Sequence, residues 1–374
     1  MKSNAIICEF NPIHAAHRYI LHLCRPTSPG DDDPVIAVMS GNFTQRGIPA
    51  VYDKYTRAES AVRCGADLVL ELPFTWCSSG VEDFARGGCA VAAGVLASAL
   101  TFGSESGDGA LLTRLAELKE SAEYRDAILA AEKESRGRGS AALFDDVLRQ
   151  HGIDEPIGAN DKLGGEYIRF GRQLGIPEFR PVKRMKDAPS ATDVRGILNR
   201  DGLDACDGWI AEEAFDAFRG HEHCPESKLD ALLFHHCRLY VRADEENDLL
   251  RYAAKTARAS VTPAQFIEKL PTKKYTLARM RREILFSVLG ITEEERGKSP
   301  AFTVLLAANS RGRAYLSRQA KNFRIPVITK PADQSALDQD AQAQYARLKQ
   351  ADELYAFLMG WEADTFMKKH PVML

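Results

Sequence analysis

The 374-residue chain is 45% hydrophobic and 27% charged, and its formal net charge is −3. This length exceeds the usual size of one hydrophobic core, so we expect two domains. The longest apolar stretch, residues 89–102, is too short and too rich in alanine to span a bilayer. Eight scattered cysteines form no C-x-x-C pair, which argues against a zinc site and a disulfide framework. We therefore expect a cytoplasmic protein with no membrane partner and no structural metal.

Apolar runs typical of buried strands alternate with helical segments along the first half of the chain. This alternation predicts an α/β fold with a Rossmann-like parallel sheet covered by helices, in which ligands bind at the carboxyl ends of the strands. The runs are AIICEF (5–10), VIAVMSG (35–41), DLVLELP (67–73), ASALTFGS (97–104) and FRPVKRM (179–185).

The first run leads into CEFNPIHAAHRYI, residues 8–20. Its Asn-Pro dipeptide is a turn signal, and the pattern from Ala15 onward is typical of a helix start. A strand, a tight turn and a helix N-terminus together form an anion site, because unpaired backbone N–H groups and the helix dipole converge there. Histidines are common in surface loops, but His14 and His17 at this position indicate a phosphate site.

Polar segments also follow the second, fourth and fifth runs, with the sequences SGNFTQRG, FGSESGD and KRMKDAPSATDVR. Each could be an ordinary loop, yet all would meet at one edge of the predicted sheet. In SATDVR, Ser190 and Thr192 can cap a helix while Arg195 reaches a phosphate. Alone this segment is typical of a plain helix N-cap, but together with the histidine motif it indicates a part of the same site.

Longer helical patterns begin after residue 198 and predict a mostly helical second domain. We place the boundary at residue 200, which gives a nucleotide-binding domain over residues 1–200 and a helical domain over residues 201–374. The patterns cover residues 229–243, 276–290 and 338–360.

Charge is concentrated in residues 271–330, which contain 13 Lys and Arg but only four acidic residues. A solvated helix face would explain part of this excess, but the excess is also large enough to hold a polyanion such as RNA. The arginines expected to contact RNA phosphates are Arg279, Arg281, Arg282, Arg311 and Arg313.

The histidine motif resembles the HxGH signature of nucleotidyltransferases related to class I aminoacyl-tRNA synthetases. The wider combination of motifs is similar to a more specific group, the bacterial tRNA(Met) cytidine acetate ligase family. The resemblance follows in order through about the first 200 residues and continues more weakly through LARMRREILFSVLGI and NSRGRAYLSRQAKNFRIPVITK. The segments that carry it are CEFNPIHAAH, MSGNFTQRGIPAVYDKYTRAESAVRCGADLVLELP, FGSES, NDKLGGEYIRF and VKR followed by SATDVR.

The resemblance implies an enzyme that joins acetate to ATP as acetyl-adenylate, releases pyrophosphate, and transfers the acetyl group to the wobble cytidine of elongator tRNA(Met). It implies catalytic roles for His14 and His17, and we expect Mg²⁺ with the ATP. Candidates for contacting acetate or the acceptor base are Asn42, Gln45 and Arg46. The implied ATP site comprises Cys8, Glu9, Phe10, Asn11, Pro12, Ile13, His14, Ala15, Ala16, His17, Gly103, Asn160, Arg184, Ser190, Thr192 and Arg195.

Two departures from the family pattern leave alternatives open. Ala16 stands where the family usually has glycine, and the loop before Ser190 is shorter than usual and lacks a histidine. A small-molecule nucleotidyltransferase would share the histidine and serine motifs without needing a basic helical domain. A divergent RNA-binding homologue with altered or lost ligase activity would keep the fold and the basic region. A dinucleotide-dependent oxidoreductase is disfavoured, since no G-x-G-x-x-G follows the first strand.

Overall fold

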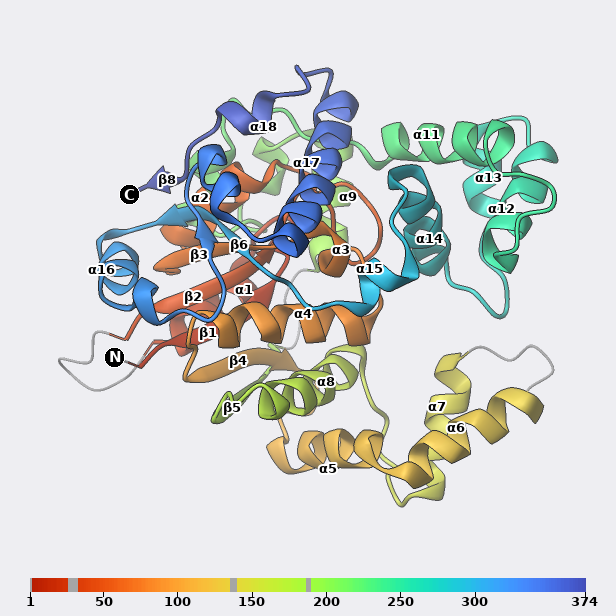
Figure 1. Ribbon diagram of the computed structural model, residues 1–374, viewed down its shortest axis with the longest axis horizontal. Helices are drawn as coiled ribbons and strands as arrows, with labels where there is room; N and C mark the ends of the chain where they lie inside the picture. Colours follow the sequence, from red (N-terminus) through yellow and green to blue (C-terminus); the bar gives the residue numbers. More distant parts are fainter. Residues whose placement is uncertain (1, 26–32, 135–139, 186–189) are drawn as a thin grey trace.

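A computed structural model describes residues 2–25, 33–134, 140–185 and 190–374 of the protein. Its centre is one twisted sheet with the strand order β5-β4-β1-β2-β3-β6-β7, and β8 pairs with β6 (Figure 1). The first three strands are buried along their whole length, as expected for continuous apolar runs covered on both faces. The strands are β1 (Asn4–Cys8), β2 (Val35–Ser40), β3 (Leu68–Leu72), β4 (Ala99–Ser104), β5 (Glu178–Lys183), β6 (Thr303–Ala308), β7 (Val327–Ile328) and β8 (Val372–Met373).

Strands β1 to β5 pair in parallel, which confirms the predicted α/β fold with a parallel sheet. The chain passes from β1 to β2 and β3 on one side and then returns through α4 to β4 on the other side of β1. Right-handed crossovers therefore place α1 and α2 on one face of the sheet and α4 on the opposite face. The reversal of direction falls between β1 and β4, and α/β proteins bind ligands in the crevice that usually forms at the carboxyl ends of strands at such a point.

The helices of the first half are α1 (Ala15–Leu23), α2 (Lys54–Arg63), α3 (Phe74–Cys77), α4 (Val81–Gly94), α5 (Gly109–Glu120), α6 (Ala122–Glu134), α7 (Ser140–Gln150), α8 (Ala159–Gln173) and α9 (Ala191–Asp201). Those of the second half are α10 (Glu212–Phe218), α11 (Glu226–Leu239), α12 (Asp248–Arg258), α13 (Pro263–Lys269), α14 (Leu277–Leu289), α15 (Glu293–Gly297), α16 (Ser310–Gln319), α17 (Gln339–Met359) and α18 (Thr365–Lys368). The three long helices expected there correspond to α11, α14 and α17. Within the described ranges, no helix is long and apolar enough to cross a membrane.

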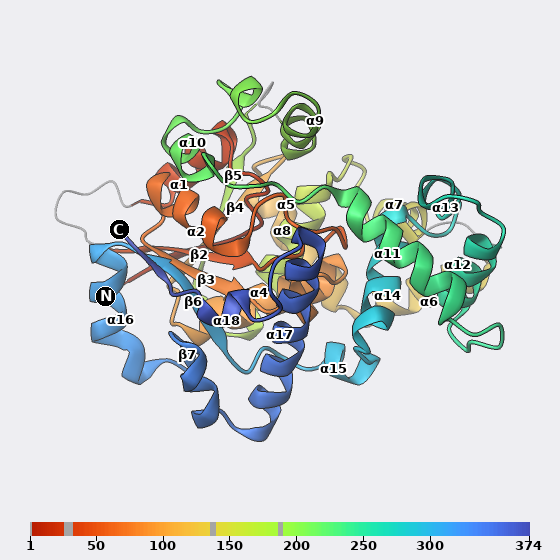
Figure 2. The ribbon, with the colours of Figure 1, turned by 90° about the horizontal axis from the view of Figure 1, so that it is seen from above.

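The sheet itself continues past the expected boundary at residue 200. Strand β6 pairs antiparallel with β3, and β7 and β8 add to β6, so residues 303–373 build one side of the sheet. Helices α11 to α14 stand away from it, as a helical arm that projects on the far side of the molecule from α16 (Figures 1 and 2). A division of the chain into functional domains at residue 200 stays a prediction.

Candidate active site

The loop between β1 and α1, residues 9–14, is called the histidine loop below and is fixed in place by contacts with neighbouring segments. The side-chain oxygen of Asn11 accepts a hydrogen bond from the backbone N–H of Val51 at 2.7 Å. The carbonyl oxygen of Asn11 accepts another from Arg195, whose Nη1 lies 2.9 Å away. Helix α1 begins directly after His14, which has extended backbone geometry at the N-cap position. The backbone N–H groups of Ala15 and Ala16, the first two of α1, therefore have no intrahelical acceptor, whereas that of His17 donates to the carbonyl of His14 at 2.9 Å.

The two histidines of the motif lie against each other at this helix start. Their rings stack with centroids 3.7 Å apart and an interplanar angle of 27°. The backbone N–H of His14 donates to Nδ1 of His17 at 3.4 Å, so the proton of a neutral His17 ring resides on Nε2. Nδ1 of His14 is buried and has no hydrogen-bond partner within the described part of the chain. The site thus offers the Nε2–H group of His17 as a hydrogen-bond donor and Nδ1 of His14 as a polar atom without a partner.

Electrostatics keep both imidazoles neutral near pH 7. Burial, with the positive charge of Arg184, lowers the pKa of His14 to about 4. Burial, the neighbouring His14 and Arg184 hold the pKa of His17 well below its usual value. Neutral rings of this kind can each donate one hydrogen bond to a phosphate oxygen, and a bound anion would favour their protonation.

The lowered pKa of His14 predicts a pH dependence of stability. An unfolded histidine titrates near 6.5 but folded His14 only near 4, so the unfolded state binds more protons between these values. Stability is therefore lost as the pH falls through this window. Urea unfolding should show a difference between wild type and His14→Gln that is larger at about pH 7.5 than at about pH 4.5. A difference that stays constant with pH would contradict the buried, neutral state of His14.

Gly103 and Arg184 lie beside the histidine pair, at the carboxyl ends of β4 and β5. The backbone N–H of Arg184 donates to the carbonyl of Ser104 at 2.9 Å. A Cβ atom on Gly103 would come within 3.3 Å of Cδ1 of Ile20 and 3.7 Å of Cγ of Arg184. The structure therefore brings together three of the predicted elements: the histidine pair, the glycine of the fourth strand and the arginine of VKR.

Asn160 lies at the start of α8, where a carboxylate engages it. Glu105 accepts hydrogen bonds from the side-chain amide of Asn160 at 2.6 Å and from the backbone N–H of Asp161 at 2.8 Å. Although burial opposes it, these bonds lower the pKa of Glu105. Asp161 is itself buried and accepts from Ser104 and Ser106. The two carboxylates, which the motif analysis did not single out, join the FGSES loop to α8.

The SATDVR segment forms the N-terminus of α9. Ser190 accepts a hydrogen bond from the backbone N–H of Asp193 at 3.2 Å and is the N-cap. Thr192 accepts one from Nη2 of Arg195 at 3.3 Å. Arg195 is buried and binds the carbonyl of Asn11, so it orders the histidine loop; its contact with a phosphate stays a prediction. The shortened loop before Ser190 falls almost entirely outside the described residues.

The three candidates for substrate contact lie in different environments. Arg46 is exposed. The backbone N–H of Gln45 donates to the carboxylate of Glu9 at 2.6 Å, which ties its turn to the histidine loop. Asn42 is buried, donates to Asp352 at 2.8 Å and accepts from the backbone N–H of Lys54 at 2.9 Å. A direct contact between Asn42 and a substrate would require both bonds to break, so Arg46 is the better placed of the three.

Beneath these loops lies Arg57, a fully buried residue of α2 that sequence patterns did not reveal. Its guanidinium donates to the carbonyl oxygens of Glu9, Ser40, Gly41 and Tyr52. Burial lowers its pKa, and within the described residues no carboxylate forms an ion pair with it. A single side chain thus joins the carboxyl ends of β1 and β2. No local signal could have identified it, since a charged residue in a helix is usually exposed.

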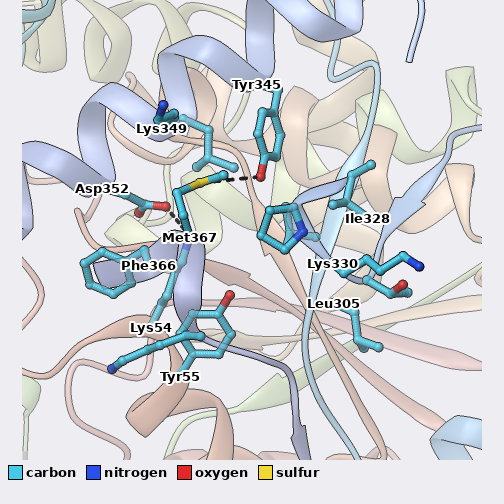
Figure 3. Close-up of a pocket in the computed structure, with 15 residues that line it drawn as sticks. Lys54, Tyr55, Leu305, Ile328, Lys330, Tyr345, Lys349, Asp352, Phe366 and Met367 are labelled. Atoms are coloured by element: carbon cyan, nitrogen blue, oxygen red, sulfur yellow. Dashed lines mark hydrogen bonds and ion pairs between the residues drawn. The ribbon is translucent and has the colours of Figure 1, made fainter. Parts of the chain in front are cut away.

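A second buried group joins α2 to the C-terminal helix α17. Nζ of Lys54 lies 2.8 Å from Glu71. It also lies 2.6 Å from Asp352, and Figure 3 labels both Lys54 and Asp352. Burial and the neighbouring Asp352 raise the pKa of Glu71 to about 7, although Lys54 opposes the shift. The adjoining cavity, also lined by Tyr345 and Phe366, measures about 20 Å³, which is room for one water molecule. This cluster is therefore structural and too small to hold a nucleotide.

The basic segment predicted to contact RNA is divided between distant places. On α14, Arg281 is buried in ion pairs with Asp230 and Glu226, and Arg282 donates to the carbonyl of Gln45 at 3.0 Å. Of the three predicted arginines on α14, only Arg279 is exposed.

The other two arginines lie on α16, at the amino-terminal edge of the sheet, opposite the histidines. Arg311 lies 3.5 Å from Asp67 and Arg313 donates to the carbonyl of Leu374 at 3.2 Å. The five arginines therefore do not form one continuous surface, and their contact with RNA stays a prediction.

A histidine pair at the first helix start of a Rossmann-like sheet defines a HIGH-type nucleotidyltransferase, and the family model described as HIGH Nucleotidyl Transferase matches residues 1–369. The chain is 30% identical to the tRNA(Met) cytidine acetate ligase of Lactobacillus delbrueckii subsp. bulgaricus over 359 residues, covering 87% of this chain and 88% of that protein. It is 29% identical to the protein of the same name from Bacillus subtilis, covering 92% and 91%. The chain belongs to the tRNA(Met) cytidine acetate ligase family.

Solved structures agree with this assignment. The crystal structure of Thermotoga maritima TmcAL bound with alpha-thio ATP superposes with a TM-score of 0.89 at 27% identity, covering both chains completely. The apo form of the same protein gives a TM-score of 0.87 at 26% identity, again over both whole chains.

Proposed function

We propose that this protein activates acetate with ATP and acetylates the wobble cytidine of elongator tRNA(Met). The observation that carries the proposal is the neutral histidine pair at the start of α1, in a chain whose relatives are named tRNA(Met) cytidine acetate ligase. The likeness to a TmcAL bound with alpha-thio ATP supports ATP as the nucleotide. In the first step, an acetate oxygen attacks the α-phosphorus, and pyrophosphate leaves. In the second, the cytidine amine attacks the acetyl carbonyl, and AMP leaves.

The residues present fit a triphosphate at the crevice between β1 and β4. The buried, unpartnered Nδ1 of His14 and the free N–H groups of α1 supply polar atoms that need a ligand. His17 presents Nε2–H, and Arg184 adds a positive charge close enough to lower the pKa of both histidines. These groups would stabilise the negative charge that develops on the α-phosphate during attack. Gly103, which a side chain would crowd against Ile20, is the proposed nucleoside contact beside them.

Acetate and Mg²⁺ belong to the same proposal. Arg46, exposed on the turn that Glu9 holds, is placed to attract the acetate carboxylate. Mg²⁺ would be held mainly through phosphate oxygens and water, as is usual with nucleotides. Within the described residues, no group of three or more His, Cys, Asp or Glu side chains is placed to hold a metal ion. Residues 1–200 would carry the chemistry, and the helical arm would hold the RNA.

The decisive experiment is to incubate the protein with ATP, acetate and elongator tRNA(Met) and to digest the RNA to nucleosides. Mass spectrometry should detect acetylcytidine, and AMP and pyrophosphate should form in equal amounts. Omission of acetate should abolish all three products. Adenylylation of a small molecule without modification of the tRNA would instead favour the small-molecule nucleotidyltransferase.

Ala16 offers a separate test of the nucleotide site. It is the second residue of α1 and is buried beside the helix N-terminus, where we place the phosphates. Ala16→Gly should tighten ATP binding, because it removes the side-chain methyl group, although glycine lowers helix stability by about 1 kcal/mol. Isothermal calorimetry with ATP would measure the change. Unchanged or weaker binding would show that the site has adapted to alanine.

A further inference from the structure

The helical arm carries a basic stripe on α12. Arg251, Lys255 and Arg258 follow one another at four- and three-residue spacing, so they share one helix face, and all three are exposed. Arg251 contacts Asp248, and Arg258 donates to the carbonyl of Val241 at 2.8 Å. Among the described residues no carboxylate lies within ion-pair distance of Lys255 or Arg258. The stripe borders a surface hollow of about 520 Å³ lined by Ala243, Asp248, Arg251, Tyr252, Lys255 and Arg258.

An exposed apolar tip adjoins this stripe. Three large apolar or aromatic side chains are exposed here: Leu239 by 64%, Tyr240 by 67% and Val261 by 79%. The ends of α11 and α12 are joined there by a hydrogen bond from Arg238 to the carbonyl of Ser260 at 3.5 Å. An exposed tyrosine ring beside several cations is the combination on which proteins stack unpaired bases.

The arm also connects this surface to the active site. Helix α11 begins at Glu226, whose carboxylate lies 3.7 Å from Arg195 and 3.2 Å from Arg281. Its 14 residues span about 21 Å at 1.5 Å per residue, and Tyr240 follows at the far end. The tip therefore lies about 21 Å along the helix axis from Glu226, the residue that contacts Arg195. One RNA can reach both places.

We propose that the α12 hollow and the apolar tip form an RNA-binding surface. Lys255 and Arg258 bind phosphates of the tRNA backbone, and Tyr240, at the end of α11 remote from Arg195, stacks on one unpaired base. This inference rests on the proposed function. It differs from the sequence-based placement of the RNA contacts, because Arg281 is buried in ion pairs and Arg282 is half-buried against Gln45, whereas the three α12 cations are exposed.

Filter binding of elongator tRNA(Met) across a salt series tests the basic stripe. Lys255→Gln with Arg258→Gln should weaken binding on the order of tenfold and reduce the slope of log K against log salt by about 1.4 to 1.8 for two lost phosphate contacts. The matched control, Arg318→Gln with Lys321→Gln, removes the same charge from an exposed region at the other end of the molecule and should bind like wild type.

Tyr240→Ala tests the stacking contact and should weaken binding roughly tenfold without changing the salt slope. Its control is Phe357→Ala, since Phe357 is 69% exposed on α17, away from the arm. Acetate-dependent exchange of pyrophosphate into ATP should stay at the wild-type rate in every variant.

If wild type binds the tRNA but both test variants bind it with wild-type affinity and slope, the surface does not bind RNA and the inference is overturned. If wild type shows the exchange but binds no tRNA at any salt concentration, the proposed function fails instead.

Discussion

Replacing His17 by alanine is expected to slow acetyl-adenylate formation by about 10²–10³-fold, the usual cost of removing one donor that stabilises transition-state charge. The hydrogen bond from the backbone of His14 to Nδ1 fixes the ring so that Nε2–H is available to a phosphate oxygen. Alanine removes that donor and also the ring on which His14 stacks. Acetate-dependent exchange of labelled pyrophosphate into ATP would measure the loss directly.

The same helix offers a control for this substitution. His22 lies in the last turn of α1 and is exposed, so His22→Ala changes the same residue type without touching the crevice. Its exchange rate should equal that of wild type. Equal rates for His17→Ala and wild type would remove His17 from the chemistry, whereas equal losses in both variants would point to damage to α1 itself.

Replacing Arg57 by methionine is expected to lower the free energy of unfolding by at least about 3 kcal/mol. The guanidinium satisfies buried carbonyl oxygens at the ends of two strands, and each acceptor left without a donor costs about 1–3 kcal/mol. Methionine fills a similar volume, so the loss reports the hydrogen bonds more than packing. Urea unfolding monitored by circular dichroism would give the difference.

Arg63 provides the comparison for Arg57 within one helix. It is exposed on α2 and pairs with Glu59 four residues earlier. Arg63→Met should therefore change stability by no more than about 0.5 kcal/mol. If the two variants unfolded at the same urea concentration, the hydrogen bonds of Arg57 would contribute nothing measurable to the fold.

The parallel part of the fold could be predicted because each strand is a continuous apolar run with its own helix after it. The histidine site could be predicted for the same reason, since a strand end, a turn and a helix start are adjacent in the chain. Strand β6 was not predicted, because its apolar run lies within a basic helical region and its antiparallel pairing with β3 depends on residues more than 230 positions away.

Buried charges limited the prediction of the site itself. A local pattern cannot distinguish Arg57, which is fully buried, from Arg63 six residues later, which is exposed. Likewise, Asn42 occupies a polar loop motif, yet its partner Asp352 follows 310 residues later. The five arginines predicted to contact RNA belong to α14 and α16, which lie far apart, so the summed charge of residues 271–330 did not describe one surface.

The contact of Lys54 and Asn42 with Asp352 has a consequence for the biosynthesis of the protein. A ribosome delivers β1 to β5 long before α17, so the growing chain contains Lys54 with only one of its two carboxylate partners, Glu71, and a β3 edge that β6 has not yet covered. An uncovered strand edge invites pairing with other chains. We therefore expect a fragment that ends near residue 200 to aggregate, and we expect the nucleotide site to mature only after nearly the whole chain has been synthesised.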